Sequence, residues 1–438
     1  MQYRWIINTC AFVAATVISG SSSESLRAAG ESWMISDVEA SPTAGLPLSV
    51  NTLLDEEPSR KPENPEQAMH YRSNAMPRTD RWWFAADYLL LWTDGNSMPP
   101  LVSTNSDVPD RAEAGVLGAD TTQVLLGGKL DEGGRSGTAL SGGYWLDECH
   151  YWGLQATWWY AGDPSDELDD VWSSQGDPVL ARPFFNAGSG MEDAQLVAYE
   201  GVVHGDVGVI TSSDLRSAEA LLSMNWRNRS RTRVDVLGGY RYFRFREGLL
   251  IQEDLTAEGG GVIPDGTTID LFDRFDTANS FHGATVGLLT NWQRGCFELD
   301  VAGKLGIGNV RRRLRIDGRT VVTTPEGGED TVETGLLALS SNAGRYEDDT
   351  FGLLPELNLE GRVLLTEHLS VNLGYNLLFL TDVYRTGDQI DRTIDPGLIG
   401  TDLPINDQGA DGLAHPAVPR ESSTLCVQGL NIGCTLSY

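Results

Sequence analysis

The chain has 438 residues, with 62 acidic and 32 basic side chains and a formal net charge of -30 at pH 7. This balance argues against nucleic-acid binding, which depends on Lys and Arg contacts to phosphate. After the N-terminus no window is long and apolar enough for a transmembrane helix. A mature chain in a membrane would therefore have to span it as a closed barrel, the other structure that satisfies its own backbone hydrogen bonds in lipid.

The N-terminus has the features of a secretory signal peptide. Arg4 is followed by an uncharged and mostly apolar run from Trp5 to Ile18, and small residues come next. The run is shorter than the roughly 20 apolar residues that a membrane-spanning helix needs, and the pattern is typical of export. We expect residues 1–29 to be removed, with the exact cleavage point left open by Arg27. A buried N-terminal helix is the alternative.

Residues 30–80 are rich in Pro, Glu, Ser and Asn and show no apolar period. Such a composition cannot bury enough apolar surface to offset the entropy of ordering. We expect a disordered or loosely ordered periplasmic segment.

From Arg81 to the C-terminus the chain repeats segments of roughly ten residues in which apolar and polar side chains alternate, as in the strands of membrane barrels. The last segment shows this best. From Leu430 to Tyr438 one face carries large apolar side chains and the other small polar ones, because successive side chains of a strand point to opposite faces. Ten strands are predicted, near residues 82–92, 136–146, 151–161, 214–226, 232–245, 279–292, 296–306, 350–364, 369–381 and 424–438.

The connections between these segments alternate between long and short. Bacterial barrels have short periplasmic turns and long external loops. The pattern therefore predicts an all-β, antiparallel transmembrane barrel with both ends in the periplasm. The strand-like piece Thr121–Leu126 falls in the first external loop, or in an extra hairpin that would make twelve strands. The long connections are residues 93–135, 161–212, 247–275, 307–349 and 381–422.

Two architectures fit the alternation. In a soluble sandwich the polar face meets water, whereas in a membrane barrel it lines the interior and the apolar face meets lipid. Glycines on the polar faces, such as Gly374 and Gly433, and aromatic residues near the segment ends favour the barrel. The candidate lumen-facing polar residues then carry both signs of charge. They are Arg233, Asp235, Arg241, Glu298, Asp300, Lys304, Glu356 and Glu360.

The sequence offers no catalytic, cofactor-binding or metal-binding constellation. The six His residues are scattered without metal-ligand spacing. Acidic clusters, such as residues 163–170 and 347–349, match no calcium-loop pattern and are interpreted as solvated loops. We therefore expect neither an enzyme nor a cofactor. After export at most one disulfide is expected, with no pairing indicated, among Cys149, Cys296, Cys426 and Cys434.

Several segments together resemble one family of membrane barrels. They are Arg81–Trp92, Met98–Val102, Val124–Gly128, Ser136–Gly137, Gly143–Asp147, Leu237–Tyr242 and Val427–Gly433. In order and spacing they are similar to the β-barrel porin 7 family, abundant in planctomycetes, over about residues 81–438. The final residue, Tyr438, stands where that family usually has Phe. The resemblance implies an outer-membrane location and a porin-like function, and it carries over no catalytic or binding residue.

Three functions are compatible with these observations. The first is passive passage of small solutes or ions, although ten or twelve strands leave a narrow lumen, because about eight strands are filled by side chains and 16–18 leave a channel. The second is a narrow or plugged barrel that anchors long acidic loops at the cell surface. The third is a soluble, secreted, carbohydrate-binding sandwich. Expected partners are outer-membrane lipid, divalent cations at acidic loops, and the outer-membrane insertion machinery through the C-terminal strand.

Overall fold

The computed structural model describes residues 81–438 apart from residues 108, 131–133, 164–169, 260–262 and 400–414. These residues belong to one compact unit, Arg78–Tyr438. The predicted signal peptide and the predicted periplasmic segment, residues 1–29 and 30–80, lie outside the described residues. No helix in the described ranges is long and apolar enough to cross a membrane.

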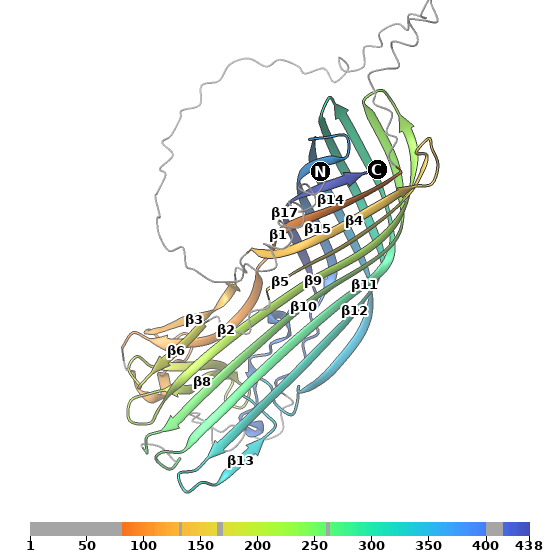
Figure 1. Cartoon of the computed structure of the whole chain (residues 1–438). Helices are drawn as coiled ribbons and strands as arrows, with labels where there is room; N and C mark the ends of the chain where they lie inside the picture. Colours follow the sequence, from red (N-terminus) through yellow and green to blue (C-terminus); the bar gives the residue numbers. More distant parts are fainter. Residues whose placement is uncertain (1–80, 108, 131–133, 164–169, 260–262, 400–414) are drawn as a thin grey trace, which may run out of the picture. The chain divides into compact units, whose positions relative to one another are not determined.

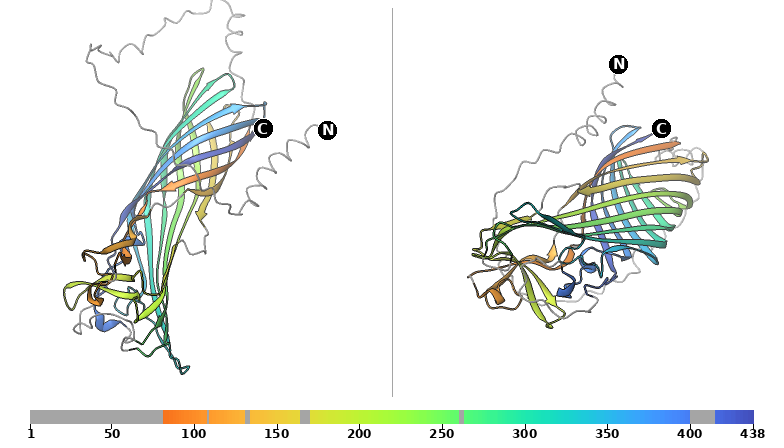
Figure 2. Two further views of the ribbon diagram at one scale, coloured as in Figure 1. Left: turned by 90° about the vertical axis from the view of Figure 1, so that its left-hand side faces the viewer. Right: turned by 90° about the horizontal axis from the view of Figure 1, so that it is seen from below.

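The main sheet is a closed ring of ten antiparallel strands (Figure 1). Each strand of the ring pairs with the next ring strand along the chain, although shorter strands outside the ring lie between some of them in the sequence. The last ring strand pairs with the first, with Trp83 opposite Ser437. Two further views follow the strands round the wall (Figure 2). The strands are β1 (Trp82–Thr93), β4 (Arg135–Trp145), β5 (Trp152–Asp163), β9 (Val203–Asn228), β10 (Thr232–Ala257), β11 (Thr268–Arg294), β12 (Phe297–Thr323), β14 (Gly344–Leu364), β15 (Leu369–Val383) and β17 (Ser423–Ser437).

The predicted barrel of ten strands is confirmed, and the twelve-strand alternative is wrong. The piece Thr121–Leu126 lies at the start of β3 (Thr122–Leu130), which pairs with β2 (Asn96–Asn105) in a separate sheet and not with any strand of the ring. Short turns join the ring strands at one end, which also holds Tyr438 (Figure 1). We call this the turn end, and the opposite end, where the long connections lie, the domain end.

The predicted long connections are largely structured, which corrects their interpretation as loops. Strands β9 to β12 are 26 or 27 residues long and continue well past their predicted ends. In these extensions the outward side chains are charged, as at Arg311 and Arg313, so the search for an apolar lipid-facing side missed them. The acidic cluster 347–349 is likewise part of β14 and not a loop.

The other connections form a second sheet at the domain end. It contains β2, β3, β7 (Leu180–Asn186), β8 (Met191–Ala198) and β16 (Thr393–Ile394). Two further short strands extend the main sheet there, β6 (Asp170–Ser174) beside β9 and β13 (Glu329–Val332) beside β12. Residues from all five long connections share one buried apolar cluster, which we call the domain core.

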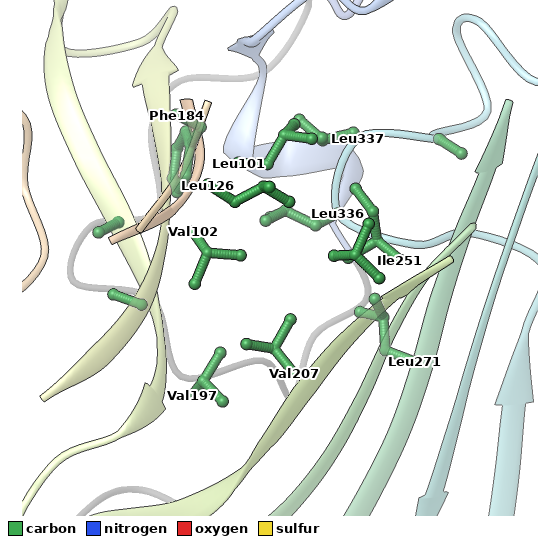
Figure 3. Packing of buried hydrophobic residues seen from close by; sticks show 14 of the residues in the cluster. Leu101, Val102, Leu126, Phe184, Val197, Val207, Ile251, Leu271, Leu336 and Leu337 are labelled. Carbon is green, nitrogen blue, oxygen red and sulfur yellow. The ribbon is translucent and has the colours of Figure 1, made fainter. Parts of the chain in front are cut away.

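The domain core joins the second sheet to the inner face of the barrel wall (Figure 3). Leu101 and Phe184 of the second sheet are less than 2% exposed, as is Ile251 of β10. The loop before β14 folds inward and contributes Leu336 and Leu337. Burial of this much apolar surface is the main stabilisation available to a sheet of short strands, since such strands are marginal by themselves in water.

The outer wall of the turn half is apolar and exposed. Ten residue positions separate His282 from Trp292 on β11, which is about 34 Å along a strand and roughly 25 Å of height at the usual barrel tilt of about 45°. An apolar surface of this extent is the lipid-facing band of a membrane barrel. Exposed members of this apolar band include Trp82, Leu140, Leu154, Trp226, Tyr240, Val286, Trp292, Leu299, Ile307, Phe351, Leu359, Leu373 and Ile432.

Candidate functional site in the barrel interior

The barrel interior begins at the turn end with a pair of ion-paired layers. Arg233 Nε lies 2.8 Å from Asp235 Oδ2, and the Arg233 guanidinium stacks over the Trp145 ring at 4.3 Å. Nearby, Arg362 pairs with Asp300, lies 3.3 Å from Glu360 and 3.7 Å from Glu298. Arg233 and Asp235 thus balance each other within β10, whereas Arg362 of β14 faces three carboxylates from β12 and β14.

A second network crosses the centre of the lumen. Lys304 Nζ lies 2.8 Å from Glu219 Oε1 and 2.9 Å from Glu356 Oε1. Arg241 also pairs with both carboxylates. Two cations and two anions, drawn from β9, β10, β12 and β14, thus close on one another, and all but Lys304 are under 9% exposed at the side chain.

This network borders a polar chamber of about 210 Å³. Asp87 enters the chamber from β1 and accepts hydrogen bonds from Asn372 and Asn431. Asn376 donates to Asn431, and Asn358 donates to Asn376. These hydrogen bonds satisfy many of the chamber's polar groups within the wall, while Arg241 Nε and Asn372 Oδ1 have no hydrogen-bond partner among the described residues.

An apolar layer fills the lumen on the domain side of the chamber. We call it the lumen plug. Its members point inward from nine strands, and Ala139 of β4 packs against them, so all ten strands contribute. Phe243, Phe245 and Phe281 are 0% exposed. Side chains lining an open, wet pore would be reached by water, whereas the members of this layer are buried. The buried members are Leu89, Leu91, Ala161, Leu215, Phe243, Phe245, Phe281, Val310, Leu354, Leu378, Leu380, Val383, Leu425 and Val427.

Two buried ionic clusters lie beyond the plug. Arg385, which follows β15, lies 2.8 Å from Glu247 of β10 and 3.3 Å from Asp94, which follows β1. Arg182 of β7 lies between Glu253 and Asp273 of the wall. These clusters fasten the inserted connections to the barrel.

Arg182 remains charged despite its burial. Burial disfavours the charged guanidinium, but Glu253 and Asp273 together outweigh this effect and raise the pKa of Arg182 above its ordinary value. The remaining acceptors of the pair are also used. Glu253 accepts from Gln195 at 2.7 Å, and Asp273 accepts from the backbone N–H of Ala338 at 2.8 Å.

All eight residues predicted to face the lumen lie on the inner face of the wall. The structure brings Arg241, Lys304 and Glu356 into one network, and it groups Glu298, Asp300 and Glu360 around Arg362. Arg233 and Asp235 pair with each other.

Three members of these networks were missed by the sequence reasoning. Glu219 stands in the segment Ser217–Ser223, where the outward residues are two alanines and a leucine, so the alternation is weak. Arg362 continues the series Glu356, Asn358, Glu360 and could have been found by extending that alternation. Asp87 lies in an aromatic segment whose polar face holds few charges.

The structure also locates the cysteines and the acidic clusters that the sequence analysis considered. No disulfide joins the four cysteines in the described part of the chain; Cys149 and Cys296 are exposed in short turns. Within the described ranges no three metal-binding side chains come together. Part of the acidic cluster 163–170 lies outside the described residues. In the other cluster, Glu347 and Asp349 face outward beside arginines.

Three solved structures with a similar arrangement are distant in sequence from this chain. The outer membrane protease OmpT of Escherichia coli is 11% identical, with a TM-score of 0.37, and covers 82% of this chain and 97% of its own. The toluene transporter TodX of Pseudomonas putida is 8% identical, with a TM-score of 0.22, over 83% of this chain and 93% of its own. The toluene transporter TbuX of Ralstonia pickettii is 7% identical, with a TM-score of 0.17, over 82% and 90%. No curated protein matches this chain.

The sequence of this chain matches a family model over nearly the whole described region. The family is described as Putative beta barrel porin-7 (BBP7), and the match covers residues 83–438. This span begins and ends with the ring of ten strands. The chain is an outer-membrane β-barrel protein and belongs to the beta barrel porin-7 family.

Proposed function

We propose that this protein is a closed outer-membrane barrel that anchors a packed β-domain at its external mouth. The observation that carries the proposal is the lumen plug, in which inward side chains of the ring are out of reach of water. A barrel of ten strands lies near the size at which side chains fill the interior. The domain core, which lies at the domain end beyond the lumen plug, covers the lumen as a second layer.

The proposal assigns a direction to the chain. Short turns belong to the periplasmic side of bacterial barrels and long connections to the outside, so the domain end faces the exterior. Residues 1–29 would direct export, and β17, which closes the ring against β1, would be the strand offered to the insertion machinery. No catalytic role is proposed.

Passive passage of small solutes is the second candidate, because the polar chamber of about 210 Å³ lies inside the wall. Passage would require the lumen plug and the domain core both to move aside. Their burial makes such an opening costly, since each fully buried Leu, Val or Phe side chain contributes about 1.5–3 kcal/mol.

Conductance of the mature chain, folded in detergent and inserted into a planar lipid bilayer, tests the proposal. We expect insertion, shown by protease protection of the barrel, without discrete current steps. Reproducible steps of one size from the wild-type chain would refute the closed barrel and support passage.

A matched pair of variants localises the barrier. Phe243→Ala combined with Phe281→Ala removes two aromatic rings from the lumen plug, and we expect this variant to conduct current across the bilayer. Tyr240→Ala combined with Val286→Ala changes the outward face of the same two strands, where both side chains are more than half exposed, and should stay closed. Equal leakage from both variants would indicate general loosening of the wall and not a barrier in the plug.

A further inference from the structure

The outer wall changes character abruptly above the apolar band. Tyr240, Tyr242, His282 and Phe351 mark its upper edge, and Tyr240 hydrogen-bonds to His282 Nδ1 at 2.7 Å. Aromatic residues of this kind gather where a barrel meets the lipid–water boundary. Beyond this edge the outward side chains of β9, β10, β11, β12 and β14 become mainly Arg, Asp and Glu.

These charged residues are aligned across the strands in three successive rows, which we call the charged rungs. The strand register sets each row, because paired residues of neighbouring strands share one face. The first rung is Arg216, Arg244, Ser280, Arg311 and Asp349; the second is Asp214, Arg246, Ala278, Arg313 and Glu347; the third is Ser212, Gly248, Asp276, Arg315 and Arg345.

A groove of about 820 Å³ runs over the second and third rungs. Its floor is made of small outward residues, Ser212, Gly248 and Ala278, on three adjacent strands. Longer side chains border it, including Arg246 and Arg345. The hollow therefore follows from the absence of large side chains at the centre of a wall that is otherwise crowded.

The charge of the rungs is positive in a chain whose net charge is -30. Seven arginines face four carboxylates in the three rows. Arg311 and Arg313 pair with Glu347 and Arg216 pairs with Asp214. Arg246 is only loosely paired, 3.8 Å from Asp214.

Two arginines of the rungs have no such pairing. Among the residues that the structure describes, no carboxylate lies within ion-pairing distance of Arg244 or Arg345. Of these two, Arg345 lines the groove and is left available to an anion from outside the chain, whereas Arg244 lies in the first rung, outside the groove.

The height of the groove above the apolar band indicates which kind of anion it would meet. Its second rung lies four residues beyond His282 on β11, which is about 13 Å along the strand and roughly 9–10 Å above the apolar band after allowing for the tilt. Headgroups occupy this level, since the polar regions add several ångströms on each side of the hydrocarbon. Phosphate binds to Arg through short, charge-assisted hydrogen bonds.

We propose that this groove binds the phosphorylated headgroup of a lipid in the leaflet next to the domain end. The acyl chains of the lipid lie on the apolar band below, and Arg246 and Arg345 bind its phosphate. Arg313 and Arg315 flank the site while paired with Glu347 and Asp317. The small floor residues admit the headgroup, and the acidic residues of the rungs orient the arginines.

Native mass spectrometry of the full mature barrel, folded in detergent, tests the groove with defined probes. The wild-type chain should retain phosphatidylglycerol in preference to phosphatidylcholine. In Arg246→Gln/Arg345→Gln the dissociation constant for phosphatidylglycerol should rise about 30-fold, the effect of two basic residues at an anionic surface. The matched control Arg319→Gln/Lys129→Gln loses the same charge from exposed positions outside the groove and should bind as the wild type does.

A second variant keeps every arginine. Ala278→Glu places a negative charge on the floor of the groove and should abolish the preference for phosphatidylglycerol. Heat-modifiable migration on gels shows for each variant that the barrel has folded. Equal retention of the two lipids by the wild type, or an unchanged preference in both groove variants, would overturn the proposal. So would full displacement of the lipid by millimolar inorganic phosphate, because the site would then recognise the free anion alone.

Discussion

Arg182 offers the sharpest test of how the second sheet is held against the barrel wall. Its guanidinium comes from β7 of the second sheet and lies between Glu253 of β10 and Asp273 of β11, with its side chain 1% exposed and both carboxylates 0% exposed. Arg182→Met keeps the length and the apolar stem of the side chain. It leaves two carboxylates buried beside each other without their cation.

Removal of one partner from a buried ion pair typically costs about 3–5 kcal/mol. Such a cost lowers the equilibrium constant for docking by about two to nearly four orders of magnitude. The loss should fall on the second sheet and not on the ring, because Arg182 is the member of the cluster that the sheet contributes. The triple variant Arg182→Met/Glu253→Gln/Asp273→Asn removes the uncompensated charge and should recover most of the docking, since a neutral replacement of a buried ionic group is often tolerated.

Amide hydrogen exchange of the folded barrel measures this effect by segment. In Arg182→Met the protected amides of β7 and β8 should exchange at least about 100-fold faster, while those of β1 and β17 keep their wild-type rates. The reasoning fails if β7 and β8 keep wild-type protection in Arg182→Met. It also fails if the triple variant is no better protected than the single one.

The remaining predictions concern orientation, pH dependence and the lumen. On intact cells a membrane-impermeant maleimide should label Met191→Cys, the exposed first residue of β8, but should reach the native Cys149 and Cys296 only after permeabilisation. Labelling in the reverse order would mean that the domain end faces the periplasm. Backbone N–H groups of the turn hold the pKa of Asp147 below its usual value, so its stabilising effect is present above the unfolded pKa of about 3.9 and is lost as the pH falls through the lower folded value. Asp147→Asn should therefore destabilise the barrel in thermal melts at pH 7, and by progressively less as the pH is lowered below about 3.9; a loss that does not shrink with falling pH would contradict this. Arg241→Met should lower the melting temperature less than Arg182→Met does, because Lys304 still contacts both carboxylates, and a larger loss would mean that Lys304 does not compensate.

The ring could be predicted from the sequence because lipid imposes a strict rule on it. The final strand was expected at residues 424–438 and is β17, Ser423–Ser437, since every second side chain from Leu430 to Leu436 is apolar. The same rule assigned Arg241 and Glu356 to the interior. It works wherever the outer face meets hydrocarbon, because a polar residue there would be expensive.

The structure of the domain end could not be predicted from the sequence, because the requirement for apolar outward side chains no longer applies there. Strands β9 to β12 continue with arginines on their outer face, which resembles a solvated loop in composition. The domain core depends on contacts between distant parts of the chain, such as Leu101, Phe184, Ile251 and Leu336. No local pattern of the sequence specifies which of these connections meet.

The long strands also make the barrel asymmetric about the membrane normal. Strands β9 to β12 stand side by side with 26 or 27 residues each, whereas β1, β4, β5, β15 and β17 have 11 to 15. One side of the protein is therefore a tall wall, and the opposite side is low. A neighbour in a crowded membrane meets different surfaces according to the side from which it approaches, so dense arrays of this protein would pack with a preferred rotation about the membrane normal.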